Sequence, residues 1–191
     1  MKKCIERNKL VIAVGILYTL NALVVVLSAW AVNLNRFRLD ITISRYIGFR
    51  RWTVFMYMIV AGLMATLAFI HIIRIKMHII KKALYLVAFS CVFLGSVFPT
   101  NRDWNVVSSN IHNVFSYTLM SCVIITIIWM LIKPLGRAQR IFSIVAICYS
   151  VFFLVVFFII KPPYLFNTVL IWENVFVYIF LAELSVEKSS E

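Results

Sequence analysis

The chain has 191 residues, of which 63% are hydrophobic and 14% are charged, and this composition excludes a soluble globular domain of its size. Its formal net charge of +12 would suggest nucleic-acid binding in a soluble protein. Most of its basic residues, however, lie at the ends of apolar runs, where anionic lipid headgroups are the nearer partner. We therefore expect an integral membrane protein that binds lipid and no nucleic acid.

Long apolar runs predict the architecture. A helix of about 20 apolar residues crosses a hydrocarbon core of roughly 30 Å. By this criterion the sequence predicts an all-α fold, a polytopic bundle of six transmembrane helices that forms a single domain over residues 1–191. The predicted spans are 10–32, 52–73, 83–98, 111–132, 141–160 and 167–184.

Basic residues predict the orientation of this bundle. Six spans place both termini on one side of the membrane, and 12 of the 19 Lys and Arg residues fall on that side. The positive-inside rule therefore predicts a multi-pass cell-membrane protein with cytoplasmic N- and C-termini. The four cysteines show no disulfide framework and no metal-binding spacing, so we predict neither a metal site nor a cofactor.

The first span and the link after it carry distinctive polar residues. Asn21 lies near the middle of the span, and we expect its amide to form an interhelical hydrogen bond. From residue 33 to 51, apolar and polar residues alternate, which predicts an extended segment or short hairpin on the membrane surface. Arg45 and Arg50 in this link can reach lipid phosphates, and a solvated loop is the alternative.

The link between the third and fourth spans is the most polar stretch of the chain. It contains Arg102, Asp103 and Trp104, and His112 follows at the start of the fourth span. Pro99 disfavours helical geometry for the residue before it, so the third span should end there. Because helix positions four apart share a face, His112 and Ser116 are predicted to point the same way.

The sixth span contains two glutamates at different predicted depths. Glu173 lies roughly 9 Å below the outer end of the span, where an acidic side chain is unfavourable unless it is protonated or paired. His112 lies in the same predicted leaflet, so the two can form a general acid and base with Asp103 above them, or they can simply neutralise each other. Glu183 falls at the cytoplasmic end, where we expect it to reach water.

A family resemblance can be stated on three of these features. They are Ile43-Ser44-Arg45-Tyr46-Ile47-Gly48 before the second span, Phe98-Pro99-Thr100 followed by Ile111-His112, and Trp172-Glu173 in the sixth span. In these the chain resembles the six-span superfamily of the damage-regulated autophagy modulators, and most of all its bacterial branch. Members often have an acidic residue and a glycine where this chain has Arg45 and Tyr46. The resemblance implies a compact six-helix membrane protein with lipid handling as its theme.

Two functions remain open at the level of sequence. In the first, the protein binds or modifies a lipid in a polar pocket that faces the outer leaflet. Arg45, Arg50, Arg102 and Trp104 would then contact the lipid, and His112, Glu173 and Asp103 would form the polar centre. In the second, the same residues are structural, and the protein is a non-enzymatic membrane partner or protective subunit that associates with another protein or with a second copy of itself. Whether the protein is an enzyme is not decided by the sequence.

Overall fold

The computed structural model describes residues 2–32, 43–47, 51–98, 106–133, 136–160 and 169–186. All regular structure in these residues is helical, which confirms the predicted all-α fold. The helices are α1 (Lys2–Val32), α2 (Ile43–Ile47), α3 (Arg51–Arg74), α4 (Ile79–Val97), α5 (Val106–Ile132), α6 (Arg137–Leu154), its π-helical continuation η2 (Val155–Ile160) and α7 (Val169–Val186).

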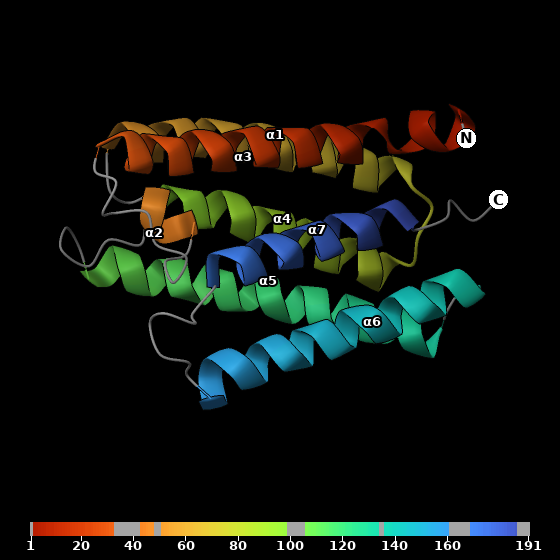
Figure 1. Cartoon of the computed structure of the whole chain (residues 1–191). Coiled ribbons are helices and arrows are strands. Elements are labelled where there is room, and N and C mark those ends of the chain that lie inside the picture. Colours follow the sequence, from red (N-terminus) through yellow and green to blue (C-terminus); the bar gives the residue numbers. More distant parts are fainter. Residues whose placement is uncertain are drawn as a thin grey trace.

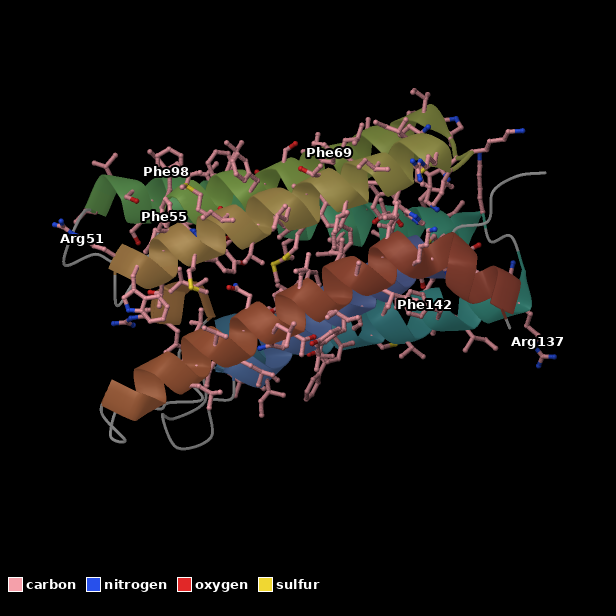
Figure 2. All side chains as sticks on the ribbon, turned by 90° about the horizontal axis from the view of Figure 1, so that it is seen from above. Arg51, Phe55, Phe69, Phe98, Arg137 and Phe142 are labelled. Atoms are coloured by element: carbon pink, nitrogen blue, oxygen red, sulfur yellow. The ribbon has the colours of Figure 1, made fainter. Side chains whose placement is uncertain are left out.

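The long helices lie side by side, and successive ones run in opposite directions (Figure 1). One end of the bundle holds the start of α1, the link with His78 between α3 and α4, and the end of α7; we call it the His78 end. The other holds α2 and Phe98, and we call it the Phe98 end. Figure 2 shows Phe98 and Arg137 at these opposite ends. At the His78 end, Asn8 Nδ2 donates to the carbonyl of Ser185 at 3.1 Å, which joins the first helix to the last.

Within the described residues, four helices are long and apolar enough to cross a membrane, and this indicates a membrane protein. They are the 20-residue stretch Asn8–Leu27 within α1, and α3, α4 and α5 with 24, 19 and 27 residues. The apolar parts of α6 and α7 are shorter over the described residues, Gln139–Leu154 and Asn174–Ser185. Large apolar side chains also cover the outside of the bundle: Leu20, Ile73 and Val145 are more than half exposed.

The helices α1, α3, α4, α5 and α6 all begin before their predicted spans, which start at residues 10, 52, 83, 111 and 141. α4 begins at Ile79 rather than at residue 83, and α5 begins at Val106 rather than at residue 111. The first turn of α4 is stabilised by polar contacts, because His78 Nδ1 accepts from the backbone N–H of Ile80 at 3.3 Å and Lys82 Nζ donates to the carbonyl of Ile73 at 3.3 Å. A helix can therefore begin several residues before the apolar run that marks its membrane span.

The extended segment predicted before the second span is wrong for residues 43–47, which form the short helix α2. Its Tyr46 and Ile47 are buried, at 1% and 3% exposure, whereas Arg45 is exposed. The hydroxyl of Thr53 at the start of α3 donates to the carbonyl of Ile47 at 2.7 Å, which satisfies the last turn of α2. Burial of two adjacent residues favours this turn over a strand, which would point them to opposite faces.

α7 packs closely on α1. The hydroxyl of Tyr18 donates to Asn174 Oδ1 at 2.9 Å, and the hydroxyls of Thr19 and Tyr178 are 2.6 Å apart. Asn21 makes no comparable bond. It is 4% exposed, and neither of its side-chain polar atoms has a hydrogen-bond partner among the described residues, so the predicted interhelical bond is not found there.

Candidate functional site

A cavity of about 120 Å³ lies among α1, α3, α4, α5 and α7. Its walls are mainly apolar and aromatic, with Phe89, Phe176 and Phe180 among them. An apolar protein cavity of about 150 Å³ holds benzene. The cavity is therefore large enough for a small apolar group, such as a few carbons of an acyl chain.

His112 lines this cavity from α5 and is held by the end of α4. Its Nδ1 lies 2.8 Å from the carbonyl oxygen of Gly95 and 2.9 Å from that of Phe98. Both partners can only accept, so Nδ1 carries a proton, and in the neutral ring Nε2 is then the acceptor. The ring thus satisfies two carbonyls that the end of α4 leaves without helical partners, and it keeps one acceptor for another group.

Gly95 faces His112 and Phe115 where α4 and α5 meet. A Cβ atom on Gly95 would lie 3.8 Å from His112 Cε1 and Nδ1 and from Phe115 Cβ, which is ordinary van der Waals contact. A larger side chain would displace the imidazole. The small residue and the histidine therefore form one packing unit, in agreement with the general use of small residues where membrane helices approach.

The cavity wall also contains other polar side chains, some of which are already hydrogen-bonded. Tyr18 donates to Asn174, and Ser96 donates to the carbonyl of Phe93 at 2.5 Å. Ser116 also lines the cavity, one helical turn after His112. The predicted shared face of His112 and Ser116 is confirmed, and these two residues are the polar pair that α5 contributes to the cavity.

The remaining residues predicted for the site can be placed only in part. Arg45 lies on α2 at the Phe98 end and is exposed. Glu173 belongs to α7, but its side chain lies outside what the structure describes. The predicted residues in the two links also lie outside the described residues: Arg50, Arg102, Asp103 and Trp104. The convergence of His112 and Glu173 therefore stays a prediction.

The sequence-based expectation for Glu183 is wrong. Glu183 does not reach water, because it is fully buried at 0% exposure. The polar groups that interact with it are Lys81 and Tyr85 on α4 and Thr126 on α5, all of which are buried too. The energetic argument that an intramembrane carboxylate needs a partner thus applies to this second glutamate of α7 as well.

Phe180 separates the Glu183 group from the cavity. Its ring lies 5.1 Å from the ring of Phe89, which lines the cavity, and 5.7 Å from the ring of Tyr85, which contacts Glu183 (ring centroids). Phe180 itself lines the cavity. The cavity toward the Phe98 end and the polar group toward the His78 end are therefore distinct sites in the described part of the bundle.

One signal in the sequence could have indicated the Glu183 group. Lys81 and Tyr85 are four residues apart on α4, so they share a face, and Glu183 follows Phe180 by three residues on α7. This spacing shows which residues of each helix point together. It does not show that the two faces meet, and that information comes only from the packed bundle.

Compared with models of known protein families, with curated protein sequences and with solved structures, the chain matches none of them. The resemblance to the six-span superfamily therefore stays a prediction. The candidate site has to be interpreted from its own geometry.

Proposed function

We propose that this chain is a six-span membrane protein with cytoplasmic termini that binds part of a lipid in the cavity among α1, α3, α4, α5 and α7. The cavity itself carries the proposal, since it combines apolar and aromatic walls with the polar pair His112 and Ser116. An acyl chain suits such walls, and a lipid hydroxyl or ester group suits a histidine acceptor beside a serine hydroxyl.

The position of the cavity supports a lipid rather than a water-soluble ligand. Four of the five helices around it, α1, α3, α4 and α5, are long and apolar enough over their described residues to span a membrane. With the proposed orientation, the Phe98 end faces outward, and the lipid would come from the outer leaflet. Arg45 on the exposed side of α2 places a positive charge at this end, which favours an anionic headgroup.

A specific observation favours a second candidate, the non-enzymatic partner subunit. His112 already donates to the carbonyls of Gly95 and Phe98, and this is a structural role at the end of α4. In this version the cavity is a packing defect and the histidine serves the fold alone. The damage-regulated autophagy modulator resemblance is compatible with either candidate.

Filling the cavity separates the two candidates. Leu119 lines the cavity on α5, whereas Ile125 on the same helix is 47% exposed and does not line it. Leu119→Trp and Ile125→Trp add the same atoms, because leucine and isoleucine are isomers. Each variant is reconstituted with phosphatidylglycerol that carries a photoreactive group in one acyl chain, irradiated, and analysed by peptide mass spectrometry.

Lipid binding in the cavity predicts that wild type and Ile125→Trp are labelled on cavity residues and that Leu119→Trp loses this labelling. Equal labelling of all three proteins outside the cavity would overturn the proposal and favour the partner subunit. Size-exclusion chromatography confirms that each variant is folded. Ser116→Leu, a smaller change in the same wall, serves as the second cavity variant.

A further inference from the structure

The residues around Glu183 form a buried polar group contributed by three helices. Glu183 on α7 and Tyr85 on α4 are 0% exposed, Thr126 on α5 is 1% exposed, and Lys81 on α4 is 5% exposed. The group lies near the His78 end, because Lys81 follows the first residue of α4 by two positions and Glu183 precedes the last residue of α7 by three. It does not belong to the cavity, since none of its members lines that space.

The hydrogen bonds of this group are incomplete. Neither carboxylate oxygen of Glu183 has a hydrogen-bond partner among the described residues, and neither does the hydroxyl of Tyr85. The hydroxyl of Thr126 donates to its own helix, at 2.8 Å to the carbonyl of Val123 and 3.1 Å to that of Cys122. Thr126 therefore has no proton left for Glu183 and offers only lone pairs.

A proton on Glu183 would complete the group. An ionised carboxylate only accepts, whereas a protonated carboxyl group has one O–H donor and keeps an acceptor oxygen. The Glu183 O–H could then donate to Thr126 Oγ1, and the Tyr85 hydroxyl could donate to the remaining carboxyl oxygen. The carboxyl group and the two hydroxyl groups would then all take part in hydrogen bonds, each as the donor or acceptor that its chemistry allows.

The structure describes one charged side chain that interacts with Glu183. Among the side chains that the structure describes, Lys81 is the charged group that interacts with it, and its positive charge attracts the ionised carboxylate. Of the other helices packed on α7, α1 contributes the amide of Asn8, which donates to the carbonyl of Ser185, and the described part of α6 contributes no charged group that interacts with Glu183. Lys81 and a proton therefore compete to satisfy the same carboxylate.

We propose that Glu183 is a proton-binding site inside the bundle, with Lys81 balancing its charge in one state and a proton bound to it in the other. The proton comes from water at the His78 end: hydronium gives its proton to one carboxylate oxygen, and a neutral carboxyl group and a water molecule are formed. Tyr85 and Thr126 hold the neutral form. The proposal is independent of lipid binding in the cavity.

Infrared difference spectroscopy tests this site. The protein is reconstituted in lipid bilayers, and spectra are compared between alkaline and acidic buffer, where a newly protonated carboxyl group gives a C=O stretching band that shifts in heavy water. We expect such a band in the wild type and its loss in Glu183→Gln. Glu173→Gln, which changes the other glutamate of α7, is the matched control and should keep the Glu183 band.

A band that persists unchanged in Glu183→Gln would overturn the proposal, as would a wild type that shows no carboxyl band while it stays folded by circular dichroism. If Glu183→Gln does not fold, Tyr85→Phe and Thr126→Val take its place, because both leave the carboxyl group present. Each should shift the frequency of the band by removing one hydrogen-bond partner of the neutral form. A band that moves in neither variant would also overturn the proposal.

Discussion

The ring of Phe180 stacks on the ring of Tyr85 with centroids 5.7 Å apart and an interplanar angle of 27°. Phe180 lines the cavity, and Tyr85 contacts the buried carboxyl group of Glu183. Phe180 of α7, which also contacts Phe89 of α4, therefore lies between the cavity and the buried polar group. The consequences can be tested by substitution.

Phe180→Ala should destabilise the bundle. The change removes the ring contacts with Tyr85 and Phe89 and enlarges the cavity, and truncation of a buried phenylalanine typically costs about 3–5 kcal/mol. The measurement is the thermal unfolding midpoint in detergent. Phe152→Ala is the control, since Phe152 on α6 is 53% exposed. Equal midpoints for the two variants would show that Phe180 is not a packing centre.

Substitution of His112 should show how much its hydrogen bonds to the end of α4 contribute to the stability of the protein. His112→Phe keeps an aromatic ring but removes the donor, which leaves the carbonyls of Gly95 and Phe98 unsatisfied and should cost about 1–3 kcal/mol. His112→Asn places an amide N–H near the position of Nδ1 and should recover part of the loss. Unfolding midpoints compare the three proteins. An asparagine variant no more stable than the phenylalanine variant would show that the hydrogen bonds contribute little.

Asn21→Leu should stabilise the protein. The buried Asn21 amide has no hydrogen-bond partner among the described residues, and an unsatisfied buried polar group costs about 1–3 kcal/mol. Asn8→Leu is the matched control on the same helix and should have the opposite sign, because Asn8 donates to Ser185 at 3.1 Å. Both are measured by thermal unfolding. A loss of stability in Asn21→Leu would indicate that the amide has a partner in the folded protein.

The proposed orientation predicts which end of the bundle is accessible from outside the cell. Val106 at the Phe98 end is 57% exposed, and Arg137 at the His78 end is also exposed. In a background with Cys4 and Cys148 changed to serine, a cysteine introduced by Val106→Cys should react with a membrane-impermeant thiol reagent in intact cells. A cysteine introduced by Arg137→Cys should react only after permeabilisation. The reverse pattern would invert the orientation.

The helical architecture could be predicted because it depends on local composition. Long apolar runs favour helices in lipid, since every backbone polar group must be satisfied within the segment. The end of α4 at Val97, before Pro99, and the shared face of His112 and Ser116 follow from constraints that act over one or two turns. These features needed no knowledge of the neighbouring helices.

The candidate site could be predicted only in part. The sequence identified His112 as a polar residue at the start of a span. Its hydrogen-bond partners, however, are the carbonyl of Gly95 on α4 and that of Phe98, which directly follows α4. Glu183 was expected to reach water because it lies near the end of its apolar run. Glu183 is buried because α4 and α5 pack around it. Its position along its own helix does not predict this packing.

The sequence by itself determined where this chain is apolar, and hence that it forms long helices suited to a membrane. The tertiary structure alone decided which faces of those helices meet. The physical reason is that most positions on these helices are apolar, so a periodic pattern does not distinguish the face toward lipid from the face toward other helices. Tyr46 and Glu183 are buried because of where neighbouring helices lie, and their own sequence context favours the surface.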